Sequence, residues 1–423
     1  MVGPTPAPIV TVHNVSRSSV GRPGRAALPG TLRAISRHRQ FRVSALFDAL
    51  GQAGGLGQRI APRLDLVRST GPRYAWRRGL EQLAWSKLPG DAGRPGYLEL
   101  WSAAARELDA ETIDLGRGFV ELRKSGARTV VWNHWVPLDD VVTMQLALDK
   151  PLVHELLAAA GIPVPRHLSF DADDLAPALA FLDEQDTPCV VKPVDMMGGS
   201  MTTSGIRSPS QLRRARLRAR RQSDRLMIER QVPGDNYRFL FLDGRLLDVI
   251  RRRSPCVTGD GRSTVGELIA EENRRRFAAA NGGRPWLLTA DLDAVFTLKA
   301  ANLSLRSVPP QGAAVLVKTV VNANGPKDNE SVTHEVGEQL VADAARAAEL
   351  IGVRLAGVDV ITGDHRRSLT ETGGVVLEVN ATPGLHYHYD ISNPEQGTAV
   401  LVPILGTLLS EVDQANPAIA RRG

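Results

Sequence analysis

The chain has 423 residues, a length that predicts about three folded units at roughly 150 residues per domain. A composition of 43% hydrophobic and 23% charged residues argues against global disorder, and the longest uncharged apolar stretch, residues 396–410, is too short for a transmembrane helix and contains Pro403. Two cysteines exclude a disulfide framework, so we expect a reducing, cytoplasmic location without a membrane partner.

The net charge of +6 is unevenly distributed along the chain. Residues 1–47 hold seven Arg and no acid, and residues 205–284 hold nineteen Arg against nine acids, so the remainder is acidic. Because residues 1–45 are rich in Pro, Gly, Ser and Arg and show no apolar period, we interpret them as a disordered basic arm. An organelle transit peptide is the alternative, although an Arg-biased bacterial coding sequence explains the composition more simply.

The first predicted elements follow residue 96. We expect an amphipathic helix over 97–108, short strands over 119–122 and 129–132, and a loop over 133–140. They indicate a small N-terminal α/β domain, which we place at 46–145. The glycine cluster at 51–57 has no strand before it, so we interpret it as a linker and not as a dinucleotide site.

The rest of the chain mixes hairpins with crossover connections. Lys150 and Pro151 open a helix that Gly161 ends, Ser208 caps another helix, and Asp243–Gly244 turns a hairpin within 237–250. We also predict strands over 189–192, 226–230, 314–321, 357–361 and 374–379, and helices over 209–222, 264–276, 333–351 and 399–412. This mixture indicates an α+β fold with antiparallel sheets.

Carboxylates interrupt two of the apolar strands near the C-terminus. Asp359 lies in Gly-Val-Asp-Val-Ile, and Glu378-Val-Asn380 follows nineteen residues later. Since residues i and i+2 of a strand point to the same face, Glu378 and Asn380 project together. Two carboxylates and an amide oxygen are ligands suited to Mg²⁺, and a lone charge among Val and Ile is costly unless it is paired or binds metal.

A lysine precedes a loop of small residues at 190–203. Lys192 ends an apolar strand, and Gly198, Gly199 and Ser200 follow it. Backbone amides of such a loop cradle polyphosphates and the lysine adds a point charge, although Gly-Gly-Ser is also a common turn. A third segment, from Glu229 through Pro233-Gly234 to Asn236 and Arg238, predicts a strand, a bend and a second strand. A hinge that binds adenine and ribose and a plain β-connection are equally compatible with it.

In this order the motifs resemble the ATP-grasp fold of carboxylate–amine ligases, in which two α+β subdomains clasp ATP. The segment from Arg251 through Gly259-Asp-Gly261 to Glu267-Leu-Ile is similar to one found in cyanophycin synthetases and fused bacterial glutathione synthetases. Glu378 to Leu385 is similar to their E-V-N-A-x-P-G-L. The resemblance covers about 140–412 and implies an ATP-grasp domain at 146–415, divided into a nucleotide lid subdomain (146–235) and a metal and substrate subdomain (236–415).

The resemblance also implies a reaction and the residues for it. ATP phosphorylates a carboxylate, and an amine then attacks the acyl phosphate to form an amide, with ADP and phosphate released. The implied nucleotide-binding residues are Lys150, Lys192, Gly198, Gly199, Ser200, Glu229, Val232 and Asn236; the implied metal ligands for two Mg²⁺ ions, with Mn²⁺ as an alternative, are Asp359, Glu378 and Asn380; the implied catalytic residues are Lys318, Asn322 and Arg238.

Departures from the family pattern keep other interpretations open. Lys318 stands where the family has an Arg, and Asn236 where it has an acid. We expect no counterpart here of the second ligase domain of cyanophycin synthetases or of the partner half of fused glutathione synthetases. We therefore expect amino acids or small peptides as substrates, and leave a homo-oligomer open. The alternatives are an ATP-grasp kinase and a nucleic-acid-associated protein with a degenerate site.

Some polar residues carry weaker signals. His386 and His388 lack further partners for zinc, Cys256 lacks an ordered His and Asn set, and the arginines of 213–221 cover several helix faces without aromatic residues between them. We interpret Cys256 as a small hydrophobe and the Arg-rich segment as a solvated helix, which does not favour nucleic acid.

Overall fold

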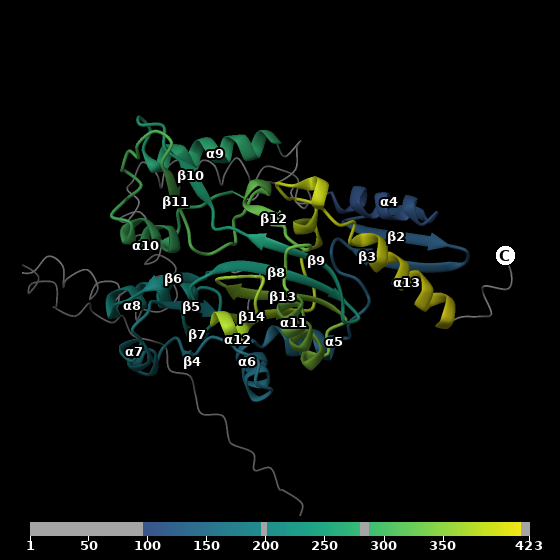
Figure 1. The fold of residues 1–423 in the computed structure, drawn as a ribbon, viewed down its shortest axis with the longest axis horizontal. Coiled ribbons are helices and arrows are strands. Elements are labelled where there is room, and N and C mark those ends of the chain that lie inside the picture. Colours follow the sequence, from purple (N-terminus) through teal and green to yellow (C-terminus); the bar gives the residue numbers. More distant parts are fainter. Residues whose placement is uncertain (1–95, 196–200, 280–286, 416–423) are drawn as a thin grey trace, which may run out of the picture. The chain divides into compact units, whose positions relative to one another are not determined.

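The computed structural model describes residues 96–195, 201–279, 287–415. The basic arm, the glycine cluster at 51–57 and the predicted loop residues Gly198, Gly199 and Ser200 lie outside these ranges. None of the helices described is long and apolar enough to cross a membrane. Figure 1 shows the arrangement of the elements.

The N-terminal described elements form an antiparallel sheet of order β1-β2-β3 that packs against two helices. The strands are β1 (Glu111–Gly116), β2 (Phe119–Lys124) and β3 (Ala127–Trp132), and the helices are α4 (Tyr97–Glu107) and the C-terminal α13 (Leu401–Ala415). Trp101, Leu122 and Leu405 lie in their shared core, which continues into Leu240 of the largest sheet. The two ends of the described chain therefore pack together, as Figure 1 shows for α4 and α13.

A second antiparallel sheet, of order β4-β7-β5-β6, has apolar residues on one face and polar residues on the other. Its strands are β4 (His167–Asp171), β5 (Cys189–Pro193), β6 (Thr203–Ile206) and β7 (Arg225–Arg230), and α7 (Ala176–Asp183) and α8 (Pro209–Ala219) pack on it. Cys189, Val191 and Ile228 face the helices. By the alternation of strands, Val190, Lys192 and Glu229 face the opposite side.

The largest sheet has the order β12-β9-β8-β13-β14 and is antiparallel throughout. Its strands are β8 (Asp235–Leu242), β9 (Arg245–Arg252), β12 (Asn329–Ser331), β13 (Leu355–Thr362) and β14 (Val375–Asn380). Tyr237, Phe239 and Phe241 pack in the core with α11 (Glu338–Ile351), beside α5 (Val141–Leu148) and α6 (Lys150–Ala159). The other face of β8 is polar at Asn236 and Arg238 and apolar at Leu240 and Leu242. The apolar end of this face packs in the N-terminal core.

An additional lobe lies between β9 and β12 in the sequence. It contains the antiparallel pair β10 (Cys256–Thr258) and β11 (Ala314–Leu316), with α9 (Val265–Ala279) and α10 (Leu292–Ala300), around Val265, Ile269 and Leu298. The remaining elements are short: α12 (Leu369–Thr372) and the 3₁₀ turns Pro326–Asp328, Leu385–His388 and Pro394–Gln396.

The topology confirms the predicted α+β class with antiparallel sheets. The predicted hairpin turn is confirmed by φ values of +48° and +75° at Asp243 and Gly244, and Ser208 accepts a hydrogen bond from the Gln211 amide as the N-cap of α8. Two boundaries were wrong by five residues: the strand predicted over 314–321 ends at Leu316, and the helix predicted from 333 begins at Glu338. The backbone groups of residues 317–321 form hydrogen bonds with the Asp293 and Arg252 side chains and with the Pro255 carbonyl, and not with a neighbouring strand. A run of apolar residues in the sequence does not show this.

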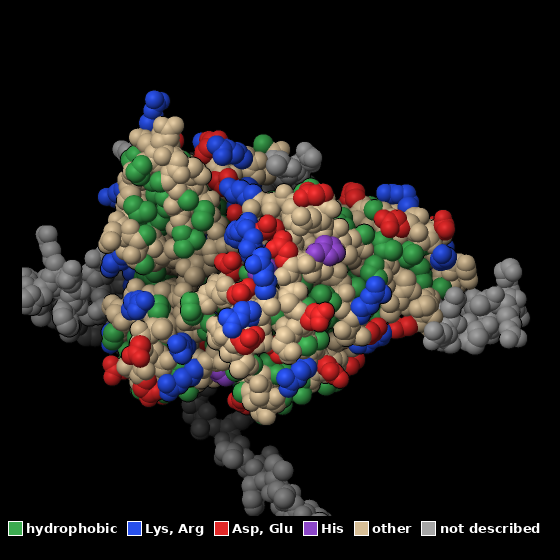
Figure 2. All heavy atoms as spheres, in the orientation of Figure 1, with side chains coloured by type: hydrophobic (Ala, Val, Ile, Leu, Met, Phe, Trp, Pro, Cys, Tyr) green, Lys and Arg blue, Asp and Glu red, His purple; other side chains and the backbone are tan. Residues whose placement is uncertain are grey.

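Charges of both signs mix on the surface in Figure 2, with a band of Lys and Arg near the middle of the face shown. In β9 and the segment after it, Arg251 and Arg253 both form ion pairs with Glu330 of β12. Part of the basic excess of 205–284 is therefore paired within the protein.

Candidate functional site

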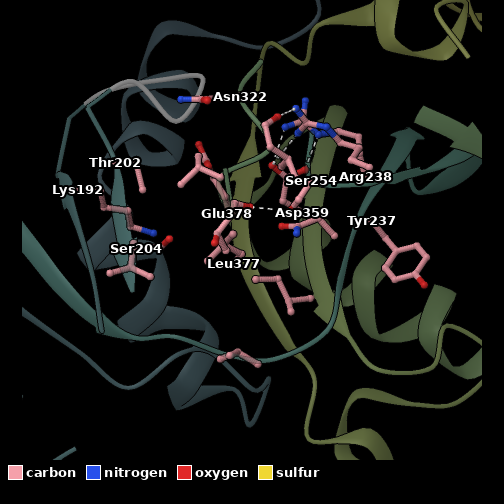
Figure 3. Close-up of a pocket in the computed structure, with 18 of the residues that line it drawn as sticks. Lys192, Thr202, Ser204, Tyr237, Arg238, Ser254, Asn322, Asp359, Leu377 and Glu378 are labelled. Atoms are coloured by element: carbon pink, nitrogen blue, oxygen red, sulfur yellow. Dashed lines mark hydrogen bonds and ion pairs between the residues drawn. The ribbon is translucent and has the colours of Figure 1, made fainter. Parts of the chain in front are cut away.

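A cavity of about 630 Å³ lies between the polar faces of the two large sheets and the segment that follows β11. The four-stranded sheet contributes Lys192, Ser204 and Glu229, and Figure 3 shows Lys192 and Ser204 across the cavity from Glu378 and Asp359. The other predicted residues among the lining are Lys150, Val232, Asn236, Arg238, Asn322 and Asn380. The structure thus brings together residues that are separated by up to 230 positions in the chain.

Strand register places an arginine and two carboxylates in one row of the largest sheet. Arg238 of β8 pairs with Asp359 of β13, and Asp359 pairs with Glu378 of β14. The Arg238 guanidinium donates to both carboxylate oxygens of Asp359, at 2.5 and 2.6 Å. Burial alone would lower the pKa of Arg238, but Asp359 and Glu378 raise it well above its usual range, so this cation stays charged.

The three predicted metal ligands lie at the ends of adjacent strands and line the cavity together. The Asn380 amide nitrogen donates to the Gly357 carbonyl at 3.1 Å, so the amide oxygen is the atom of this side chain that a metal ion could use. Glu378 has Lys150 as its charged neighbour, with 3.7 Å between Nζ and Oε1. No cluster of three His, Cys, Asp or Glu side chains occurs in the described ranges. Two carboxylates and an amide oxygen, all hard donors at a partly open wall, nevertheless fit Mg²⁺ that shares its shell with phosphate.

The predicted phosphate lysine is paired across the four-stranded sheet. Lys192 Nζ lies 2.7 Å from a carboxylate oxygen of Glu229, and both side chains are more than nine-tenths buried. Lys192 and Glu229 are diagonal neighbours on β5 and β7, since the residue opposite Lys192 is Met227. The Glu229 carboxylate is therefore already bound to Lys192, which argues against the prediction that this side chain binds adenine.

A second buried arginine, Arg252 of β9, was not among the predicted site residues. It lines the cavity at 8% exposure, donates to the Val321 carbonyl at 2.8 Å and lies over the Tyr387 ring. Its nearest carboxylate is 4.0 Å away on Asp359, whose two oxygens already accept from Arg238, and its Nε has no hydrogen-bond partner. Burial and Arg238 lower the pKa of Arg252. The three consecutive arginines 251–253 indicate in the sequence that this segment is positively charged. Which of them faces the cavity follows only from the strand register.

Lys318, predicted to aim at the transferred phosphate, is not among the residues that line the cavity. Its side chain is 1% exposed, and its Nζ donates to Asp291 at 2.9 Å and to Asn322 Oδ1 at 2.8 Å. Asn322 itself lines the cavity. The structure therefore places Lys318 behind Asn322, and a direct catalytic role for Lys318 remains a prediction.

The N-terminal elements reach the cavity through an aromatic contact. The His386 side chain lines the cavity and bonds to the Tyr97 hydroxyl at 3.0 Å, and His134 from the predicted 133–140 loop lines it as well. Burial, followed by His134 and Arg252, lowers the pKa of His386 to about 3, so the ring is neutral at physiological pH. Burial also raises the pKa of the Cys256 thiol, which disfavours the nucleophilic thiolate.

Arginines of α8 contact protein groups. Arg216 donates to the Ala172 carbonyl, Arg218 to Asp291, and Arg220 forms an ion pair with Asp173. The Arg214 guanidinium lies over the Phe296 ring. The prediction of a solvated helix is therefore wrong for these four side chains, because two acids, a carbonyl and an aromatic ring of neighbouring segments contact them.

His154, which packs beneath the site, makes stability depend on pH. It is fully buried, and Nε2 donates to the Leu377 carbonyl at 2.9 Å. Burial first, then Lys192, His167 and Lys150, lower its pKa from 6.5 to about 3. Between these values the unfolded chain binds a proton that the folded chain does not, so acidification favours unfolding.

We expect the free energy of unfolding to fall between pH 6.5 and 5 by about 2 kcal/mol on account of His154, from 1.36 kcal/mol per pKa unit. His154→Gln removes this contribution, so its urea unfolding curves at the two pH values should lie closer together than those of the parent protein. An equal pH dependence in both proteins would contradict the neutral, buried state of His154.

Comparisons with known proteins were made with the whole chain. It is 35% identical over 260 residues to a cyanophycin synthetase of Nostoc sp., an alignment that covers 61% of this chain and 28% of the relative. It is 28% identical over 327 residues to the glutathione biosynthesis bifunctional protein of Enterococcus faecalis, with 74% of this chain and 42% of the relative covered. No family model matches the chain.

Among solved structures, a bifunctional glutathione synthetase from Pasteurella multocida aligns with 74% of this chain and 43% of its own, at 21% identity and a TM-score of 0.49. The sequence alignments confirm the resemblance to cyanophycin synthetases and fused glutathione synthetases that the motifs predict. The chain spans less than half the length of either sequence relative.

Proposed function

We propose that this chain, similar in sequence to part of cyanophycin and glutathione synthetases, is an ATP- and Mg²⁺-dependent carboxylate–amine ligase with an ATP-grasp architecture. The carrying observation is one cavity that is lined by Lys150 and Lys192, by Asp359, Glu378 and Asn380, and by the buried Arg238 and Arg252. Phosphoryl transfer to a carboxylate gathers negative charge, and fixed cations beside a hard-oxygen metal site are what it needs.

The nucleotide would lie between the two large sheets, with the proposed lid subdomain (146–235) on one side and the proposed metal and substrate subdomain (236–415) on the other. Lys150 and Lys192 would hold phosphates. Because the Glu229 carboxylate binds Lys192, the adenine is left to the backbone near Val232, and Asn236 on the adjacent β8 would bind the ribose.

Asp359, Glu378 and Asn380 would hold Mg²⁺, which supplies charge neutralisation at the phosphates when bound. Arg238 would hold the Asp359 carboxylate in orientation through its two hydrogen bonds. Lys150, close to Glu378, offers its charge to the same phosphates.

In the proposed reaction a carboxylate oxygen attacks the γ-phosphorus, and the bond to ADP breaks. The resulting acyl phosphate is attacked at carbon by an amine, phosphate leaves, and the amine loses a proton as the amide forms. Asn322 and Arg252 would orient the acyl group, because Arg252 offers a buried Nε with no protein partner. Two apposed sheets would keep water from the acyl phosphate.

The substrates are proposed to be amino acids or small peptides. The test is a screen for ADP release with pairs of amino acids and dipeptides, together with mass spectrometry of the products. An amide product supports the ligase, a stable phosphorylated product selects the kinase, and a protein that binds DNA or RNA but no ATP selects the nucleic-acid interpretation.

Arg252→Lys tests the substrate end of the cavity. Lysine keeps the charge but loses the planar fork, so we expect kcat/KM for the carboxylate substrate to fall about 10- to 100-fold while KM for ATP changes little. Arg253→Lys is the matched control, since Arg253 is half-exposed and pairs with Glu330 outside the cavity. Equal losses in the two variants would remove Arg252 from substrate binding.

A further inference from the structure

Two aspartates at the start of α10 lie outside every predicted site. Asp293 is fully buried, and Asp291 is 8% exposed and caps α10 by accepting a hydrogen bond from the Ala294 amide. Neither lines the cavity. Two buried carboxylates in a lobe with an apolar core require a physical explanation, because each is costly unless it is fully paired.

Asp293 joins two segments that are more than a hundred residues apart. One carboxylate oxygen accepts from the Ser204 amide at 2.9 Å and the Ser204 hydroxyl at 2.5 Å. The other accepts from the Thr319 and Val320 amides, both at 3.1 Å. Ser204 belongs to β6 of the four-stranded sheet, and Thr319 and Val320 belong to the segment after β11.

Asp291 makes a parallel connection through two cations. Its carboxylate lies 2.6 Å from Arg218 and 2.9 Å from Lys318. Arg218 in turn donates to the Thr202 carbonyl and the Thr203 hydroxyl, and Lys318 donates to Asn322. Burial raises the pKa of Asp291, but Arg218 and Lys318 hold it below its ordinary value, so the carboxylate is ionised.

Five of the six residues that these connections hold line the cavity. They are Thr202, Ser204, Thr319, Val320 and Asn322, whereas Thr203, Asp291, Asp293, Arg218 and Lys318 do not line it. We propose that Asp291 and Asp293 are positioning residues that fix two adjoining parts of the cavity wall, β6 and the 319–322 segment, relative to each other for the nucleotide. That the ligand is a nucleotide rests on the proposed function. That the two aspartates connect β6 with the 319–322 segment rests on the hydrogen-bond geometry alone.

The fixed spacing has a chemical consequence. Phosphoryl transfer depends on orientation at the scale of an ångström, and groups held from behind by charged hydrogen bonds keep their geometry without occupying the site. The same arrangement gives Lys318 a role: it binds Asp291 and orients the Asn322 side chain at the cavity.

Asp293→Asn is the direct test. The asparagine oxygen can still accept from Ser204, but its NH₂ faces the amides of Thr319 and Val320 and cannot accept from them. Asp291→Asn is the second variant, because asparagine caps helices as well as aspartate does while the charge that binds Arg218 and Lys318 is lost. Asp328→Asn is the control: a buried aspartate of the same region that binds Arg276 and does not line the cavity.

Two measurements are made on the full chain: hydrogen exchange of the segments 201–206 and 316–323, and binding of magnesium AMPPNP by calorimetry. We expect Asp293→Asn to exchange about tenfold faster in 316–323 and Asp291→Asn in both segments, and each to bind the nucleotide about tenfold more weakly. Asp328→Asn should match the parent protein in both segments and in affinity.

Unchanged exchange in both segments, or an affinity loss no larger than that of Asp328→Asn at equal stability, would overturn the proposal. If the parent protein itself binds no nucleotide, the proposed function fails, and the exchange data still decide whether the aspartates join the two parts of the wall. Should Asp293→Asn fail to fold, the same two measurements on Asp291→Asn still test the proposal, because asparagine at this position can cap α10.

Discussion

Glu378→Gln should reduce ADP release by at least about 1000-fold in kcat/KM, equivalent to about 4 kcal/mol of transition-state stabilisation. Glutamine keeps the size of the side chain but removes the carboxylate that stands beside Asp359 on adjacent strands. It also removes the neighbour of Lys150 at 3.7 Å, so both the metal site and the cation beside it are affected. The measurement is a coupled ADP assay with the substrate pair found in the screen.

Glu349→Gln is the matched control, because Glu349 is exposed on α11 and does not line the cavity. The defect should also show in Mg²⁺ titrations, with a higher magnesium concentration needed for half-maximal nucleotide binding. A Glu378→Gln protein with near-normal activity and an unchanged magnesium requirement would remove Glu378 from the proposed ligand set.

Lys192→Met should abolish ADP release and also destabilise the protein by about 3 kcal/mol, because it leaves the buried Glu229 carboxylate without its partner at 2.7 Å. The two effects have different causes. The loss of stability comes from an uncompensated charge in the four-stranded sheet, whereas the loss of activity comes from the missing cation at the phosphates.

The double variant Lys192→Met/Glu229→Gln separates the two effects. Neutralising Glu229 removes the buried charge, so urea unfolding should recover most of the lost stability while ADP release stays absent. Recovery of both stability and activity would show that Lys192 acts only as the partner of Glu229 and does not bind phosphate. Failure to recover stability would contradict the pairing itself.

The sequence predicts the strands of the site well, because the side chains there follow simple periodicity. Glu378 and Asn380 are two residues apart and share a face, as predicted, and the Asp243–Gly244 turn sets the β8–β9 register. The helix and sheet boundaries are less well predicted. The strand expected over 314–321 ends at Leu316, because the amides of Thr319 and Val320 donate to a buried aspartate and not to a neighbouring strand.

The sequence by itself determined the α+β class and the order of the motifs, because strand alternation and residue chemistry are local properties. The resemblance of those motifs to ATP-grasp ligases then named ten residues that meet at the cavity. Only the tertiary structure decided which charges are paired. Register brings Arg238 to Asp359, and Lys192 to Glu229, and it leaves Arg252 at the cavity without a full partner. Lys318, chosen by its position in a motif, instead lies behind Asn322, since a buried aspartate from a distant helix binds it. Pairing over long sequence distances depends on how sheets and lobes pack, and no local pattern encodes it.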